Sequence, residues 1–113
     1  MLDAGTGSIL RRMNGVDCLA VLRALGEMNR VRIMGLLLKE PLGVGVIAER
    51  LGISEYNVSK HLRILKEAGL LDLEKAGKQR LYRVADSLQQ TLAANQNVLE
   101  LGCCTFRFDK LPK

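Results

Sequence analysis

The chain has 113 residues, of which 48% are hydrophobic, so it can form one domain with a single small core. Its 17 Lys and Arg outnumber 12 Asp and Glu, and the resulting charge of +5 favours a polyanionic partner. It lacks a run of about 18 apolar residues, which excludes a membrane-spanning helix, and its first residues do not resemble a secretory signal. We therefore expect a cytoplasmic protein with one domain, residues 1–113, and no membrane partner.

The first third of the chain predicts helices. The Gly-rich stretch Met1–Gly7 is expected to be disordered, and a short helix is expected over Ser8–Met13. A longer helix is expected over Val16–Leu25, and a further one over Asn29–Lys39, which is apolar nearly all round and should lie centrally. The apolar stripe of the longer helix consists of Cys18, Leu22 and Leu25.

A helix-turn-helix is predicted next. Val46–Gly52 reads as a short amphipathic helix that ends at a glycine. Ser54 stands where an N-cap is needed, and a second helix is expected over Glu55–Ala68. At about 100° per residue, Leu62, Leu65 and Gly69 fall within roughly 40° of Val58 and form its inner face.

The outer face of this second helix is polar, and it carries Tyr56, Asn57, Ser59, Lys60 and Arg63. Hydroxyl, amide and cationic groups are what base edges and phosphates require of a helix in the major groove of DNA.

A β-hairpin is predicted directly after the helix-turn-helix. Its strands are expected at Leu70–Glu74 and Arg80–Val84, with Lys75–Gln79 as the turn. A last helix, capped by Asp86 or Ser87, is expected to run to about Leu99, followed by a tail over residues 100–113. The expected stripe of this last helix consists of Leu88, Leu92 and Leu99.

These elements predict a mainly α fold with a small β-hairpin wing, a winged helix-turn-helix. The helices at Val16–Leu25 and Leu88–Leu99 carry more apolar surface than so small a core can absorb, which predicts a homodimer. Two-fold symmetry would set two recognition helices about 34 Å apart, one turn of double-stranded operator DNA.

Basic residues are concentrated between positions 60 and 83. We expect the recognition helix to read base edges and the turn of the wing to grip phosphate or the minor groove. The predicted DNA-binding residues are Ser54, Tyr56, Asn57, Ser59, Lys60, His61, Arg63, Lys78, Gln79 and Arg80. His61 is expected at the protein–DNA boundary, where its ring would donate to a phosphate; pH sensing or metal binding by this ring is the alternative.

The sequence resembles the ArsR/SmtB family of winged-helix repressors over nearly its whole length. The resemblance rests on Leu25–Ile33, on Ser54–Leu70, and on a wing with Gly77 and the exit strand Tyr82–Val84. It implies a homodimer that occupies an operator until a metal, metalloid or redox signal lowers its affinity for DNA.

The sensor sites typical of this family are absent from their usual places. The family's arsenic site has a cysteine pair at the start of the first helix of the helix-turn-helix, where this chain reads Gly43–Ile47 without cysteine. The family's zinc site on the last helix uses an acidic residue with several histidines, whereas His61 is the one histidine here. A nitrogen-rich zinc or nickel site is therefore excluded.

The chain has three cysteines, and the missing export signal favours thiols over disulfides. Adjacent Cys103 and Cys104 rarely form a disulfide with each other, and two neighbouring thiolates suit trivalent arsenic or antimony as an inducer. Some arsenic-responsive members of the family resemble this chain in having such a C-terminal pair. Cys18 is expected to pack in the core; at the dimer interface it would supply a third metal ligand.

Three functions remain open. The first is a transcriptional repressor released from DNA by a thiophilic inducer at Cys103 and Cys104, with no required cofactor. The alternative is a redox or persulfide sensor in which Cys18 and a tail cysteine become covalently linked. The third is an architectural DNA binder with inert cysteines. An enzyme is disfavoured, since the sequence offers no nucleophile–His–acid set and no phosphate-binding glycine loop.

Overall fold

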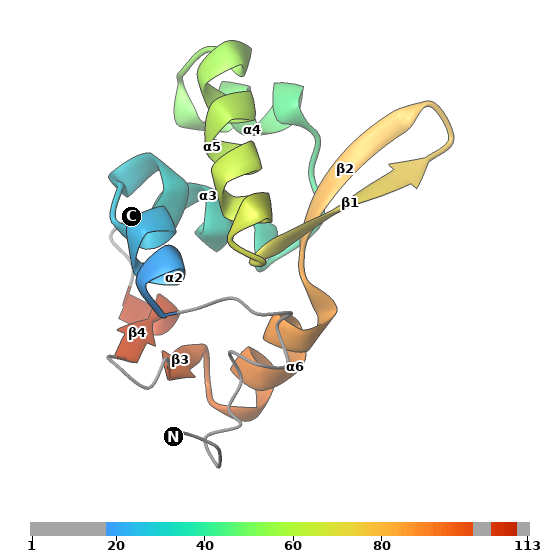
Figure 1. Cartoon of the computed structure of the whole chain (residues 1–113). Coiled ribbons are helices and arrows are strands. Elements are labelled where there is room, and N and C mark those ends of the chain that lie inside the picture. Colours follow the sequence, from blue (N-terminus) through green and yellow to red (C-terminus); the bar gives the residue numbers. More distant parts are fainter. Residues whose placement is uncertain (1–17, 101–104, 111–113) are drawn as a thin grey trace.

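The computed structural model describes residues 18–100 and 105–110 (Figure 1). The predicted helix over Ser8–Met13 and the cysteines at 103 and 104 lie outside these ranges. The described helices are α2 (Cys18–Leu25), α3 (Met28–Leu37), α4 (Val44–Leu51), α5 (Glu55–Glu67) and α6 (Asp86–Ala94). The described strands are β1 (Leu71–Ala76), β2 (Gln79–Val84), β3 (Val98–Glu100) and β4 (Thr105–Arg107), and a 3₁₀ turn η1 covers Phe108–Lys110.

Helix α3 lies at the centre of the core, as its apolar sequence predicts. Ile33, Met34 and Leu37 are buried to 2% exposure or less. They share one continuous cluster with side chains of α2, α4, α5, α6 and the start of the wing. The surrounding helices thus bury their apolar stripes against a common element.

The helix-turn-helix is divided by a glycine. The residue after α4, Gly52, has a φ of +72° and donates its N–H to the Ala48 carbonyl at 2.8 Å. A left-handed residue at this position ends a helix and turns the chain, and glycine adopts it without steric cost. The break allows α5 to start after only Ile53 and Ser54.

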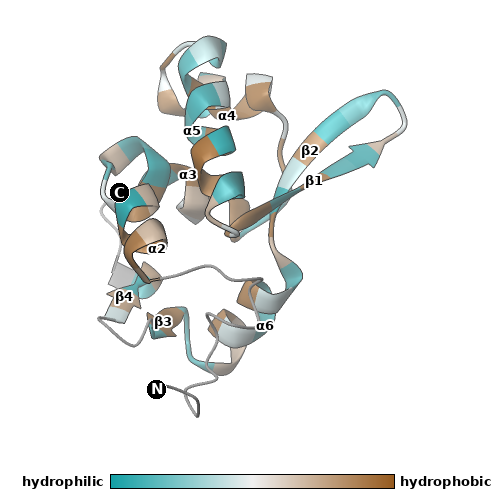
Figure 2. Ribbon diagram, viewed as in Figure 1, coloured by the Kyte–Doolittle hydropathy of each residue, from teal (hydrophilic) through white to brown (hydrophobic). Residues whose placement is uncertain are grey.

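The wing is longer than the sequence predicts, and its turn is shorter. β1 and β2 pair from Leu71↔Val84 to Ala76↔Gln79, so the expected turn over Lys75–Gln79 is wrong in extent. Gly77, with a φ of +68°, permits a two-residue turn, which adds Lys75 and Ala76 to the first strand and Gln79 to the second. The wing extends away from the helices (Figure 1), and Figure 2 shows that its tip is hydrophilic.

A short bridge joins the wing to the helix-turn-helix. Leu42, just before α4, donates its N–H to the Tyr82 carbonyl at 3.1 Å and accepts from the Tyr82 N–H at 2.8 Å. A two-stranded hairpin is marginal alone, so this third segment stabilises the base of the wing.

The last helix ends earlier than predicted. α6 stops at Ala94, and Gln96 and Asn97 have φ values of 56° and 65°. The Asn97 N–H donates to the Leu92 carbonyl at 2.7 Å, which closes the helix end and reverses the chain. Leu99 is therefore buried from strand β3 and not from a helix.

A second hairpin, β3–β4, was not predicted. It pairs Val98 with Arg107 and Glu100 with Thr105, and the buried Phe108 follows it. Strands of three residues carry too weak a period for recognition from sequence. Among the described residues, no helix combines the length and the apolar character needed to cross a bilayer.

Two alanine substitutions test this account of α4. We expect Gly52→Ala to lower the free energy of unfolding by about 1 kcal/mol, because alanine is strained at positive φ. Gly45→Ala, within α4, should raise it by about 0.5–1 kcal/mol, because alanine is the better helix former. A Cβ at 52 has nothing within 4 Å, and one at 45 meets Glu55 Oε2 at 3.5 Å, so neither clashes. Urea unfolding of both variants measures the two changes in the free energy of unfolding. Changes of the same sign and size would contradict the explanation of why α4 ends at Gly52.

Candidate nucleic-acid interface

Helix α5 has the two faces that its sequence predicts. Val58, Leu62 and Leu65 are each 0% exposed. Tyr56 is 73% exposed, and the other polar residues of the outer face are exposed as well. In Figure 2 brown and teal segments alternate along this helix. Packing of the apolar stripe therefore directs the polar stripe outward.

The start of α5 is capped as expected. The Ser54 Oγ accepts a hydrogen bond from the Asn57 backbone N–H at 3.1 Å. This bond satisfies one of the free N–H groups of the first turn and leaves the Ser54 hydroxyl proton available to another acceptor. The Asn57 side chain, one turn further on, is exposed.

An open groove of about 490 Å³ runs between the outer face of α5 and the wing. It is lined by Tyr56, Ser59, Lys60, Arg63, Lys66 and Tyr82. Sequence reasoning missed Lys66 and Tyr82. Lys66 lies three residues after Arg63 and could have been found by extending the helical stripe, whereas Tyr82 reaches the groove only because β2 folds back beside α5.

Two of the groove residues also contact each other. The Lys60 Nζ lies 5.5 Å from the centre of the Tyr56 ring. This cation–π contact holds the ammonium and the ring together on the exposed face, one turn apart. The pair thus presents a cation and a flat apolar surface to a partner.

The wing carries two kinds of cation. Lys78, Gln79 and Arg80 are exposed at or beside its tip, as predicted. Arg83, nearer the base, pairs through Nη2 with Asp86 Oδ1 at 2.7 Å and through Nε with Glu74 Oε1 at 3.5 Å. The hydrogen bond and charge of Asp86 raise the pKa of Arg83 above its ordinary value. Arg83 therefore links β1, β2 and α6, while the tip presents its charges to solvent.

His61 lies on a different side of α5 from the groove residues. Its ring is half-buried, and its Nδ1 lies 3.3 Å from Nη1 of Arg30 on α3. The predicted hydrogen bond from this ring to a DNA phosphate remains a prediction.

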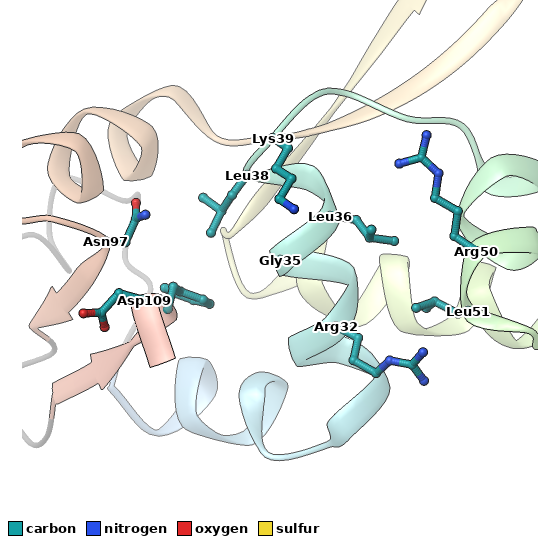
Figure 3. A pocket seen from close by; sticks show the side chains of 10 residues that line it. Arg32, Gly35, Leu36, Leu38, Lys39, Arg50, Leu51, Asn97 and Asp109 are labelled. Carbon is teal, nitrogen blue, oxygen red and sulfur yellow. The ribbon is translucent and has the colours of Figure 1, made fainter. Parts of the chain in front are cut away.

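A further hollow, of about 550 Å³, lies between α3, the end of α4 and the C-terminal segment (Figure 3). Leu36, Leu38, Leu51 and Phe108 form its apolar walls, and Asp109 lies on the side of the C-terminal segment. Its cations are Arg32, Lys39 and Arg50. The described lining contains neither cysteine nor histidine, so this hollow does not offer the ligands of a thiophilic ion.

The predicted sensor residues are only partly within the described chain. Cys18 is half-buried and packs against the core, as expected. It is disulfide-bonded, so the expectation of free thiols is wrong for this residue: an argument from the cellular compartment carries no information on which sulfurs lie close together. Cys103 and Cys104 lie outside the described residues. Across residues 18–100 and 105–110, no group of three or more His, Cys, Asp or Glu could hold a metal ion.

Comparison with known proteins agrees with this geometry. The helix-turn-helix domain family matches residues 25–74. A probable mercury resistance operon repressor of Streptomyces lividans is 32% identical over 90 residues, covering 74% of this chain and 71% of that protein. The transcriptional regulator CmtR of Mycobacterium tuberculosis is 40% identical over 65 residues, covering 58% of this chain but only 55% of CmtR.

Solved structures show the same fold. The NMR structure of CmtR, described as a cadmium metal-sensor, superposes with a TM-score of 0.58 at 36% identity, covering 68% of this chain and 81% of that one. The homodimeric winged helix-turn-helix domain of Mb0332 from Mycobacterium bovis gives a TM-score of 0.62 at 25% identity, with 85% of each chain covered. The fold and the polar face of α5 define a winged helix-turn-helix regulator. The chain belongs to the ArsR/SmtB family of transcriptional regulators.

Proposed function

We propose that this protein is a dimeric transcriptional repressor that binds an operator through α5 and the wing. The observation that carries the proposal is the groove of about 490 Å³ in which Lys60, Arg63 and Lys66 line up along α5. Within the described chain, the ion pairs use Arg50, Arg83 and Arg107, and none uses these three cations. Cations that lack an acidic partner and follow one face of a helix suit the phosphates of DNA.

Base readout and phosphate contact can be separated by mutation. We expect Asn57→Ala to weaken binding to the operator more than binding to random DNA, because an amide reads base edges. Lys78→Ala should weaken both alike and lower the slope of log affinity against log salt by about 0.9, the share of one phosphate contact. Fluorescence anisotropy titrations at several salt concentrations measure both quantities.

Lys39→Ala is the matched control, because Lys39 is exposed but lies at the end of α3, away from the groove. It should leave the slope and the ratio of operator to random affinity unchanged. If Asn57→Ala leaves that ratio unchanged too, the assignment of base readout to this face is wrong.

The dimer surface that we propose is centred on α2. Leu19 is 68% exposed there, whereas Val21, Ala24 and Leu25 of the same helix are buried in the core. The sequence also predicts a dimer contact through the helix at Leu88–Leu99. However, the side chains of Leu92 and Leu99 are 1% and 0% exposed within one chain. A charge at Leu92 would disrupt the core of the protomer, so this position cannot report on the dimer. The homodimeric state of Mb0332 supports the proposal.

Leu19→Glu therefore tests the dimer better than a change at Leu92. We expect this variant to remain folded and to sediment as a monomer at micromolar concentration, because a charge would be buried at the interface. Val46→Glu is the control, since Val46 is 40% exposed on α4. A wild-type monomer, or a Leu19→Glu dimer as stable as wild type, would overturn the proposed interface.

The proposed inducer is a thiophilic ion, and more specifically trivalent arsenic or antimony bound by Cys103 and Cys104. Two thiolates separated by one peptide bond lose little loop entropy on chelation. The names of two relatives refer to mercury and to cadmium, which are also soft ions that select sulfur ligands. Cys18 could supply a third sulfur only after reduction, since it is disulfide-bonded.

A redox or persulfide sensor is the second candidate, and the disulfide of Cys18 favours it. In this reaction two thiols form an S–S bond and release two protons and two electrons. A polysulfide or peroxide would accept the electrons. The disulfide-linked and the reduced forms would differ at the start of α2, next to Leu19 of the proposed dimer surface. The spacing of the two recognition helices in the dimer would then differ as well.

Cysteine variants separate these candidates. For a metalloid sensor, reduced Cys103→Ser and Cys104→Ser should bind the operator normally but resist release by arsenite or antimonite. Cys18→Ser should matter only if the site has three sulfur ligands. Anisotropy measures the release, cadmium and mercury serve as further inducers, and mass spectrometry identifies the adducts. A full arsenite response in the double tail variant would exclude the arsenic site, and release by polysulfide alone would favour the redox sensor.

A further inference from the structure

Arg30, in the first turn of α3, closes the end of α2. Its Nε donates to the Ala24 carbonyl at 2.5 Å, and its Nη2 donates to the Arg23 carbonyl at 3.3 Å. Carbonyls in the last turn of a helix have no partner within the helix and carry partial negative charge. A guanidinium is suited to this position because its donors form a rigid fork. The half-buried Arg30 side chain thus fixes α3 to α2.

The third nitrogen of the same guanidinium is directed at α5, the proposed recognition helix. Its Nη1 lies 3.3 Å from Nδ1 of His61, which is 31 residues further along the chain. An arginine can only donate, so Nδ1 of His61 must accept. A hydrogen bond at this contact therefore requires a neutral ring with its proton on Nε2. A protonated ring would have no acceptor to offer and would place a second positive charge against Arg30.

We propose that Arg30 is a positioning residue that holds α5 against the end of α2, and that it can do so only while His61 is neutral. The inference builds on the proposed binding of DNA by α5. It adds that the orientation of this helix depends on pH, through a contact behind the DNA-facing groove. Because α2 is also the proposed dimer helix, the same side chain would connect the dimer to the recognition helix.

The surroundings of His61 contain charges of both signs. On α5 itself the charged residues are Glu55, Lys60, Arg63, Lys66 and Glu67, and those of the elements packed against it are Arg23, Glu27, Arg30, Arg32, Glu49, Arg50, Asp72, Glu74 and Lys75. Glu27 Oε1 already accepts from the backbone N–H of Arg30 at 3.0 Å. Among the described residues, the side chain shown bonding to the ring is Arg30.

The sign of the pH effect separates this proposal from the simpler role of His61. If the ring donated to a DNA phosphate, protonation would add a cation to the interface, and affinity would rise as pH falls. If the ring must accept from Arg30, protonation breaks the contact, and affinity falls. Since the chain contains one histidine, a change between about pH 8 and pH 5.5 can be assigned to His61 by its replacement.

The experiment measures operator affinity by anisotropy at constant ionic strength across this range, in reductant, for wild type and His61→Asn. Asparagine places an acceptor oxygen near the position of Nδ1 and does not titrate. We expect wild-type affinity, relative to His61→Asn at the same pH, to fall about three- to tenfold on acidification. Arg30→Lys should weaken binding at pH 8, because lysine lacks the rigid fork of guanidinium donors. In this background the pH-dependent difference between proteins with and without His61→Asn should vanish. Arg32→Lys, on the same helix and exposed, is the matched control and should behave as wild type.

Thermal unfolding without DNA gives a second readout. The wild-type melting temperature, relative to that of His61→Asn, should fall over the same pH range, and the difference should vanish in the Arg30→Lys background. Absence of operator binding at any pH would overturn the proposed function, and the melting data would still test the contact. A wild-type affinity that rises in acid, or a melting difference that is independent of pH, would overturn the inference.

Discussion

Burial of one face of α5 against α3 is the constraint on which the other features depend. Val58, Leu62 and Leu65 are fully buried, and they pack in the same core as Ile33 and Met34. Burial of each such leucine stabilises the fold by roughly 1.5–3 kcal/mol, far more than a surface ion pair contributes. The core therefore decides how α5 is rotated about its axis. A helix that buries one stripe must present the opposite one, so the exposed cations and amides follow from the packing behind them.

The same packing also places the wing. Leu70 and Leu71 follow α5 after a single turn and are buried, so β1 leaves the core at a defined point. The Ala85 N–H donates to the Leu70 carbonyl at 3.0 Å where β2 returns, and the bridge between Leu42 and Tyr82 connects β2 to the segment before α4. The base of the wing is thus held on both sides. The groove between the wing and α5 is therefore a property of the assembled fold.

The extent to which the sequence predicts this structure depends on the range of the interactions. The cap at Ser54, the glycine end of α4 and the two faces of α5 are local, and each was predictable. The end of α6 was not, because Leu99 continues the apolar stripe while positive φ values at Gln96 and Asn97 reverse the chain. Periodicity identifies buried residues but does not distinguish a longer helix from a turn and a strand that bury the same leucine. The contact between Arg30 and His61 joins separate helices, so no sequence window contains it.

Net charge is a poor guide to which cations meet a partner. Arg83 is neutralised by Asp86 and Glu74, Arg107 contacts Asp109 at 2.8 and 3.2 Å, and Arg30 is occupied by backbone carbonyls. These arginines carry formal charge, yet their donors are directed at protein acceptors. The lysines and arginine of the groove differ, because their side chains face solvent along one stripe. Arginine's several donors suit it to joining elements of the fold, whereas an exposed row of cations retains its attraction for an external polyanion. The same chain therefore uses its basic residues in two ways, and only the three-dimensional arrangement separates them.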